Sequence, residues 1–274
     1  MSNKAASSVP AKFYDYGSMA GAGFENQTQA DVKIPFLGIL QKLSPELSKN
    51  DPKFIPGAEE GDLLNTVTRD VYPGATGIIF QPCDTNHVIV EWKPRSAGGG
   101  FVAIHQTDSP LYKDAIRERD QRVLKGSGDP KELRKIKTPS GNDLIETFYI
   151  YGHLLSEVNG EILSPMIIAC SSSKISAYRG YMSRVRLVRG RPPMFAHQMC
   201  ITTVFDKNAQ GQPFSNFVFQ AAVNNNVMES LISPETGALL LEEGDTLLSQ
   251  SRQGLLTGKM DTGSETGEAT TEAF

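Results

Sequence analysis

Short segments with the composition of β-strands recur along most of this sequence, and turn-forming residues separate them. The turn signals include Pro73-Gly74, Asp84–Asn86 and Gly98–Gly100. No regular alternation of strand and helix accompanies these segments, which excludes a doubly wound α/β fold. We therefore predict a mainly β or α+β class, with antiparallel strands in a barrel or a sandwich. The predicted strands are Leu63–Thr68, Gly77–Pro82, His87–Lys93, Phe101–His105, Leu144–Leu155, Ile162–Ala169, Met194–Phe205 and Asn216–Val223. In Leu144–Leu155 we expect Phe148 and Ile150 on one face and Tyr149 and Tyr151 on the other.

Three further segments have the apolar spacing of amphipathic helices. In one of them Ile175, Tyr178, Met182 and Val185 are spaced by three or four positions, which places them on one side of a helix. The expected helices are Asp31–Leu47, Ser171–Val185 and one around Gly237–Ser251.

The termini and one internal stretch have compositions unlike the rest. Residues 1–30 are rich in small residues without a period, and residues 257–274 are rich in Gly, Thr, Ser and Glu. We expect a flexible N-terminus over 1–30, a folded body over 31–256 and a disordered acidic tail over 257–274. The alternating charges of 113–137 predict a helical or mobile insertion on the surface of that body.

Composition restricts the class of protein. The longest apolar runs, such as Pro165–Cys170, are far shorter than the roughly 18 residues of a membrane span. Cys83, Cys170 and Cys200 are too few and too scattered for a disulfide framework, so we expect free and mostly buried thiols. The N-terminal residues lack the apolar middle of a secretory signal. These features exclude a membrane protein and predict a cytoplasmic location.

One catalytic pattern is present in a weak form. Asp84, Glu91 and Lys93 resemble the carboxylate and lysine set with which many nucleases hold Mg²⁺. Glu91 and Lys93 also share one face of an alternating strand, where an exposed ion pair is the commoner explanation. We therefore expect no enzyme and keep a Mg²⁺-dependent nuclease as the alternative.

Two pairs of possible zinc ligands are equally weak. Cys83 precedes His87 by four positions and His197 precedes Cys200 by three, but the spacings differ and no Cys-x2-Cys accompanies them. Buried thiols and ordinary histidines are the simpler explanation, so no metal and no cofactor is expected.

The charge distribution points to nucleic acid, although the formal net charge is −4, from 27 Lys and Arg against 31 Asp and Glu. Between Ile162 and Phe205 there are six cations and no acid. Proteins bind single-stranded nucleic acid with cationic side chains that contact the phosphates and with exposed aromatic rings that stack on the bases. The predicted DNA-binding residues are Lys174, Arg179, Tyr181, Arg184, Arg186, Arg189 and Arg191.

Aromatic residues in and around this segment divide into core and surface candidates. Tyr178 lies within the apolar stripe of the expected helix, so we assign it to the core. Tyr181 lies at the edge of the stripe, and we expect it to be exposed and to stack on a base. Trp92, Phe217 and Phe219 are further stacking candidates, each more consistent with a core position.

The C-terminal tail ends in a single aromatic residue after a series of spaced acids. Its acidic residues and its last residue are Asp261, Glu265, Glu268, Glu272 and Phe274. This ending resembles that of bacterial and phage single-stranded DNA-binding proteins. The resemblance implies that the terminal Phe and its carboxylate dock into a replication partner, such as a polymerase or a helicase, while the acids compete with DNA.

Together these features predict a phage-type single-stranded DNA-binding protein with an oligonucleotide-binding, OB-like antiparallel β-barrel. Such a protein binds single-stranded DNA without sequence preference during phage replication or recombination, in the cytoplasm of a bacterial host. A single-strand annealing factor, which could assemble as a homo-oligomer, is a further alternative beside the nuclease.

Overall fold

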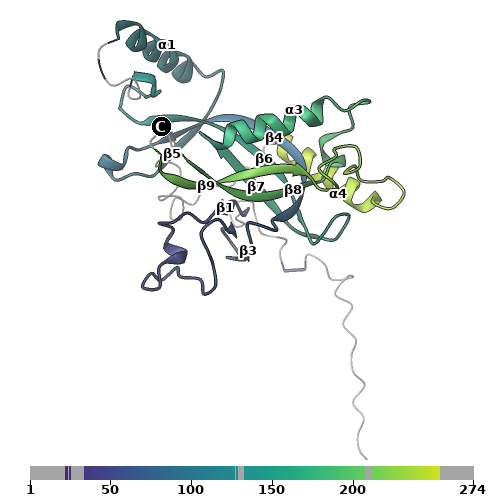
Figure 1. Ribbon diagram of the computed structural model, residues 1–274. Helices are drawn as coiled ribbons and strands as arrows, with labels where there is room; N and C mark the ends of the chain where they lie inside the picture. Colours follow the sequence, from purple (N-terminus) through teal and green to yellow (C-terminus); the bar gives the residue numbers. More distant parts are fainter. Residues whose placement is uncertain are drawn as a thin grey trace, which may run out of the picture.

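Two antiparallel sheets form the body of the protein in the computed structural model, which describes residues 22, 23, 25, 34–126, 128, 133–207 and 211–253. The larger sheet has six strands in the order β7-β6-β4-β8-β9, with β5 paired to β4 as a branch (Figure 1). The smaller sheet has the order β1-β2-β3. The strands are β1 (Leu37–Ile39), β2 (Leu63–Asn65), β3 (Val71–Tyr72), β4 (Ile78–Trp92), β5 (Phe101–Gln106), β6 (Asp143–Leu155), β7 (Ile162–Ser171), β8 (Met199–Lys207) and β9 (Pro213–Ala221).

The predicted mainly β class is therefore confirmed, and the sheets are not closed into a barrel over the described residues. The helices are α1 (Pro110–Lys125), α3 (Lys174–Arg186) and α4 (Ala238–Arg252), with short 3-10 turns at Pro45–Leu47, Arg95–Ala97 and Met194–Ala196. In the part of the chain that the structure describes, no helix has both the length and the apolar composition to cross a membrane.

The 15-residue strand β4 organises the larger sheet. It pairs with β6 from Ile79 to Trp92, with β8 through its first three residues and with β5 through its last five. The predicted turn at Asp84–Asn86 is wrong, because these residues pair with Tyr151, Ile150 and Tyr149 of β6. The irregularity is only a bulge between Pro82 and Asp84. Pairing with a long, regularly alternating neighbour outweighs the local turn preference of these polar residues.

Helices α3 and α4 pack on opposite faces of the larger sheet, with α3 against β6, β7 and β9 and α4 against β4 and β6. The alternation along β6 separates the two cores as predicted: Phe148 and Ile150 join the core under α3, and Tyr149 and Tyr151 join the core that includes Leu247 of α4. Both helices were expected from sequence and are confirmed.

Close packing of α4 depends on a glycine. A Cβ at Gly244 would lie 2.8 Å from Gln81 Nε2 and 2.7 Å from Phe195 Cβ. The Gln81 amide also donates hydrogen bonds to the carbonyl oxygens of Phe195 (2.7 Å) and Leu240 (2.8 Å). This buried amide therefore joins β4 to α4 and to the turn before β8.

The helix predicted over Asp31–Leu47 is wrong for the residues described. Leu37–Ile39 is strand β1, which pairs with β2, and Phe36 forms a parallel bridge with Ile167 of β7. Only Pro45–Leu47 forms a short 3-10 turn. The apolar spacing misled the prediction because Leu37 and Ile39 are buried by sheet pairing and not by a helix face.

The free edge of β9 is capped by a side chain. The backbone N–H of Ser215 donates to Gln41 Oε1 (2.9 Å), and Gln41 Nε2 donates to the backbone carbonyl of Ser215 (2.8 Å). The amide of Gln41 thus takes the place of a neighbouring strand at this residue.

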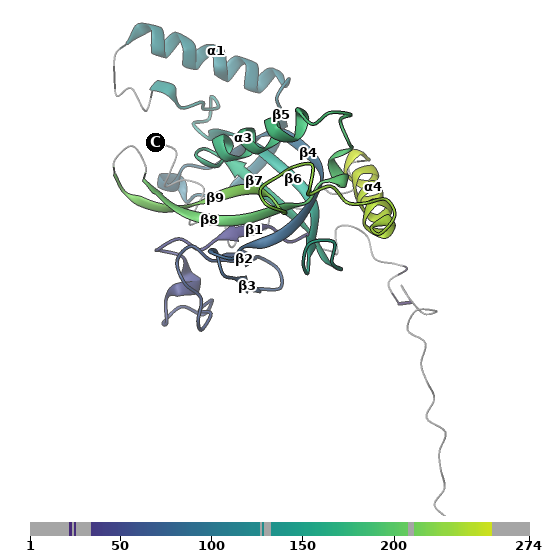
Figure 2. The same ribbon diagram turned by 45° about the vertical axis from the view of Figure 1, so that its right-hand side comes forward.

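The charged insertion forms α1, which projects from the body in both ribbon views (Figures 1 and 2). Ser109 caps its first turn by accepting a hydrogen bond from Tyr112 N (3.4 Å), and Gly126 ends it in the left-handed conformation. Ala115 is its one buried residue, and it packs with Ile89 and Leu144 at the base. Of the segment 113–137, which was expected to be helical or mobile, the residues up to Lys125 are helical.

Candidate nucleic-acid interface

Helix α3 turns one face to the core and its cations to the outside. Tyr178, Tyr181 and Val185 are buried. Tyr178 stacks on Phe148 with ring centroids 4.7 Å apart, which confirms its predicted place in the core. Its hydroxyl bonds to the side chain of Thr85, while burial raises the pKa of Tyr178.

The prediction that Tyr181 is exposed is wrong, because only 3% of this residue is accessible. Its ring lies 6.5 Å from that of Phe219, and its hydroxyl has no hydrogen-bond partner among the described residues. Burial raises the pKa of Tyr181. Tyr181 lies about 60° from Tyr178 around the helix. Because α3 packs on β9 as well as on β6 and β7, its buried face is wide enough to include that position.

The other aromatic stacking candidates are core residues, as the simpler interpretation held. Trp92, Phe217 and Phe219 are all buried. Lys174 is half-buried, with Nζ 5.3 Å from the centroid of the Phe217 ring. No aromatic residue within α3 is therefore left on the surface to stack on a base.

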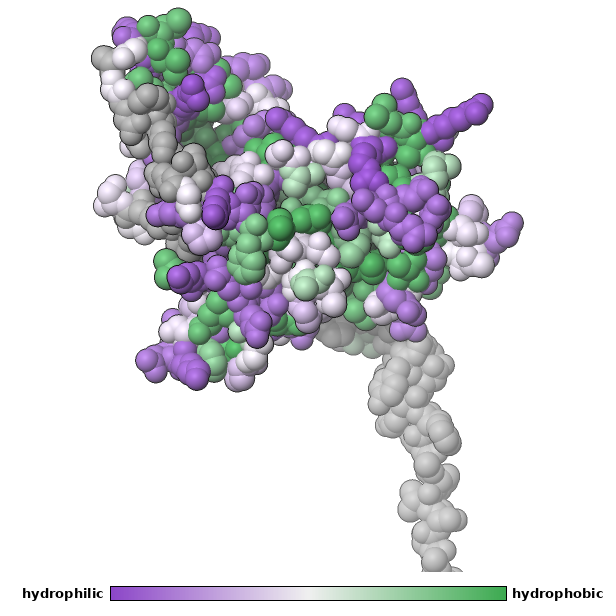
Figure 3. Space-filling view, in the orientation of Figure 1, coloured by the Kyte–Doolittle hydropathy of each residue, from purple (hydrophilic) through white to green (hydrophobic). Residues whose placement is uncertain are grey.

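The five predicted arginines are all exposed: Arg179, Arg184, Arg186, Arg189 and Arg191. Hydrophilic side chains stand out at the carboxyl end of α3 (Figure 3). Two of the five have protein partners: Arg179 Nη2 lies 3.3 Å from Glu146 Oε1, and Arg184 donates to the side chain and backbone oxygens of Asn225. Within the described ranges, Arg186, Arg189 and Arg191 form no ion pair or hydrogen bond through their side chains.

A contact that sequence reasoning missed lies beside Arg179. His87 of β4 is the cross-strand partner of Phe148, and their rings are nearly parallel, with centroids 4.1 Å apart and planes at 10°. His87 Nε2 lies 2.8 Å from the same Glu146 oxygen that Arg179 contacts. The sequence presented His87 only as a possible zinc ligand, because the register that places it on Phe148 is not visible without the sheet.

The residues of the possible nuclease site do not come together. Asp84 and Glu91 are seven positions apart on one continuous strand, which separates them by about 23 Å. No group of three metal-ligating residues is found in the described ranges.

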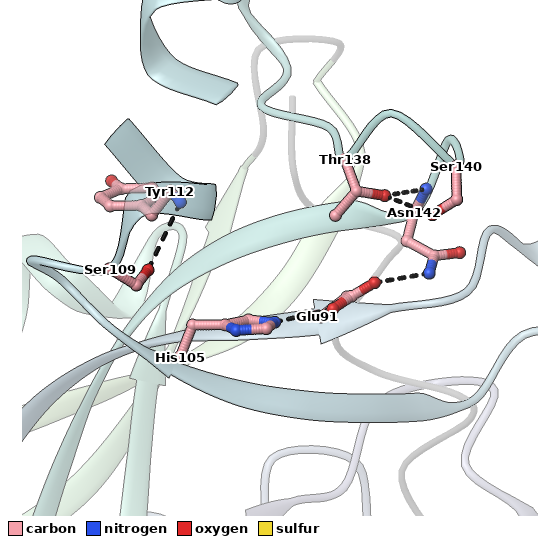
Figure 4. Close-up of polar contacts among 7 residues, drawn as sticks. All are labelled: Glu91, His105, Ser109, Tyr112, Thr138, Ser140 and Asn142. Carbon is pink, nitrogen blue, oxygen red and sulfur yellow. Dashed lines mark hydrogen bonds and ion pairs between the residues drawn. The ribbon is translucent and has the colours of Figure 1, made fainter. Parts of the chain in front are cut away.

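Glu91 is also not part of an exposed ion pair with Lys93, so that expectation is wrong. The residue is 7% exposed, and its carboxylate accepts hydrogen bonds from His105 Nε2 (2.7 Å) and Asn142 Nδ2 (2.6 Å) (Figure 4). Burial acts to raise the pKa of Glu91, but these two hydrogen bonds lower it overall. Because Asn142 follows the α1 insertion, Glu91 fixes the return of the insertion to the sheet.

The possible zinc ligands likewise belong to no group of three metal-ligating residues in the described ranges. Cys83 is buried, with a pKa raised by burial, whereas His87 is on the surface. His197 is buried, and burial lowers its pKa. The three thiols are free, with Cys83 and Cys170 buried and Cys200 partly so, as predicted.

The predicted partner-binding residues Asp261, Glu265, Glu268, Glu272 and Phe274 lie outside the described residues, as do 1–21, 24 and 26–30 of the N-terminus that was expected to be flexible over 1–30. Their roles stay predictions from sequence.

A family model described as Pam3 phage gp34-like protein matches residues 3–229. The matched range contains every strand of both sheets and the whole of α3, and it ends before α4. No curated protein and no solved structure matches the chain.

Proposed function

We propose that this protein, which belongs to the family of Pam3 phage gp34-like proteins, binds single-stranded DNA without sequence preference through the exposed arginines of α3 and the loop after it. The observation that carries the proposal is the set of three exposed arginines, Arg186, Arg189 and Arg191, without a carboxylate partner in the described ranges. Guanidinium groups on a surface usually acquire acidic neighbours, and this segment of the sequence contains none. Unpaired arginines bind phosphate through charge-assisted hydrogen bonds.

The arrangement of the cations favours a single strand over a duplex. Arg179 and Arg186 lie seven residues apart on one edge of α3, and Arg184 lies on the opposite side of its exposed face. A single strand can bend to bring successive phosphates to groups that point in different directions. Duplex DNA has a persistence length of about 150 bp and would have to be deformed to do so.

The family match supports a place in phage biology, and the acid-free segment supports the nucleic-acid role. The proposal needs an open basic surface and no closed barrel, so the OB-like barrel stays a prediction from the resemblance of the tail. Recruitment of a polymerase or a helicase by Phe274 likewise stays a prediction.

The test is fluorescence anisotropy with labelled single-stranded and duplex oligonucleotides at several salt concentrations. Single-stranded DNA should bind more tightly, and log affinity should fall with log salt by about 0.7 per phosphate contact. Arg186→Gln/Arg189→Gln should weaken binding to all sequences alike and reduce the slope by about 1.4.

A matched control removes two cations that already have acidic neighbours. Arg117 lies 3.0 Å from Asp114 and Arg119 lies 2.7 Å from Asp120, all on α1. Arg117→Gln/Arg119→Gln changes the net charge by the same amount as Arg186→Gln/Arg189→Gln. It should change the affinity for single-stranded DNA and the salt slope much less. Equal loss in both double variants, or tighter binding of duplex, would contradict the proposal.

A further inference from the structure

We infer that His87 is the stacking platform for one base of the bound single strand, beside Tyr178 and Arg179 of α3. This inference rests on the proposed function and names a base subsite for it. It places the aromatic contact at His87 on β4, whereas the sequence had predicted this contact at Tyr181 on α3.

Three rings form a continuous stack that begins at the surface and ends in the core. His87 lies parallel to Phe148 at 4.1 Å, and Phe148 lies against Tyr178 at 4.7 Å with planes at 28°. Tyr178 is buried, Phe148 is half-buried and the side chain of His87 is 40% exposed. Within the described residues, Phe148 is the only ring that contacts His87, so the stack can accept one more flat group at its exposed end.

The His87 ring is also held in place before any ligand binds. Its Nε2 donates to Glu146 Oε1 at 2.8 Å, and the neighbouring Arg179 approaches the same oxygen at 3.3 Å. A ring fixed on both its face and its edge loses little rotamer freedom on binding, so more of the stacking energy appears as affinity.

A nucleotide stacked on His87 would have cations within reach of its phosphates. The guanidinium of Arg179 lies 5.3 Å from the centroid of the Phe148 ring, directly beside the stack. Arg186 follows on the same edge of α3, about 10 Å further along the helix axis. A strand that begins on His87 can therefore continue along this edge toward Arg189 and Arg191. The carboxylate of Glu146 does not repel the strand strongly, because Arg179 already balances its charge.

The experiment separates the ring of His87 from its hydrogen bond. His87→Gln keeps a donor for Glu146 and removes the ring, whereas His87→Phe keeps a ring on Phe148 and removes the donor. Each variant is titrated with a labelled oligo-dT and with an oligonucleotide of the same length in which the bases are replaced by abasic sites. Thermal melts confirm that both variants are folded.

We expect His87→Gln to bind oligo-dT about tenfold more weakly, with an unchanged salt slope, and His87→Phe to bind it about as tightly as the unmodified protein. On the abasic strand all three proteins should bind alike. If His87→Gln binds oligo-dT normally, or loses the same factor on the abasic strand, the platform is overturned while the proposed function stands. If the unmodified protein binds neither strand, the proposed function itself fails.

Discussion

Two cross-strand pairs on the same strands, β4 and β6, use a histidine in opposite ways. Gln81 pairs with His153 at the end of the sheet that lies under α4, and His87 pairs with Phe148 at the end beside α3. His153 is buried, with Nδ1 3.1 Å from Gln81 Oε1 and 3.9 Å from Cys83 Sγ. His87 is on the surface and contacts a charged pair.

The difference lies in where the polar groups find their partners. At the buried end, the Gln81 amide bonds to His153 and to two backbone carbonyls. These partners lie on β6, on α4 and in the turn before β8, so the polar groups there hold these elements together. At the exposed end, a ring face and several guanidiniums keep binding capacity that the described residues do not use. Changes at the buried end should therefore alter stability, and changes at the exposed end should alter binding.

Removing the buried amide should have the largest effect. Gln81→Leu leaves the carbonyls of Phe195 and Leu240 and the His153 ring without this partner, so we expect a loss of about 3 kcal/mol in the free energy of unfolding. Urea denaturation measures it. Gln220→Leu, at an exposed position of β9, is the control and should change stability by less than about 0.5 kcal/mol.

The same cluster should make the protein sensitive to acid. Burial lowers the pKa of His153 from 6.5 to about 4. The unfolded chain therefore takes up a proton below about pH 6.5 that the folded chain refuses until about pH 4. Stability should fall across this window, by at most about 3 kcal/mol. His153→Gln keeps a donor for Gln81 and should reduce the difference in unfolding free energy between pH 7 and pH 4.5. An unchanged difference would show that other groups, such as Glu91, cause the acid loss.

The two buried tyrosines of α3 differ in their hydroxyl groups. That of Tyr178 has a hydrogen-bond partner, and that of Tyr181 has none among the described residues. Tyr178→Phe removes the bond to Thr85 and should cost about 1 kcal/mol. Tyr181→Phe removes a buried hydroxyl that has no partner among the described residues, so stability should stay equal or rise by up to about 1 kcal/mol. Neither change should alter DNA affinity. A marked loss of binding in Tyr181→Phe would restore Tyr181 as a contact residue.

Neutralising the acid at the exposed end should have the smallest effect on stability. Glu146→Gln still accepts from His87 and Arg179, so the unfolding free energy should change by less than about 0.5 kcal/mol. Affinity for single-stranded DNA should rise by about threefold at low salt, because one negative charge beside the arginines is gone. Asp114→Asn on α1 makes the same change of net charge and should raise affinity less.

Sequence patterns predicted those parts of the fold that depend on local periodicity. The alternation of β6 and the apolar spacing of α3 gave both elements and, for β6, the correct faces. The helix predicted over Asp31–Leu47 rested on the spacing of Phe36, Leu37, Leu40 and Leu43, and it was wrong because Leu37 belongs to a short strand whose apolar residues can mimic part of a helical stripe. The turn predicted at Asp84–Asn86 failed because the pairing of β4 with β6 is a long-range property.

Some features of the candidate site could also be predicted from local sequence, and others depended on the arrangement of the sheet. The exposure of the arginines could be predicted from composition. Their segment contains no acidic residue that could pair with a buried guanidinium, and an unpaired charge is costly to bury. The burial of Tyr181 depended on how many strands α3 covers, which no local pattern contains. His87 could not be identified before the register placed it opposite Phe148, because neither residue carries a distinctive motif.

The amide of Gln41 has a consequence for how this protein behaves at high concentration. Open sheet edges allow chains to join edge to edge, and that pairing needs unoccupied backbone groups. At Ser215 both groups are occupied, so an incoming strand would first have to break two hydrogen bonds worth about 1 kcal/mol each. A shorter side chain in place of Gln41 would leave both backbone groups of Ser215 free to pair with a strand of another chain.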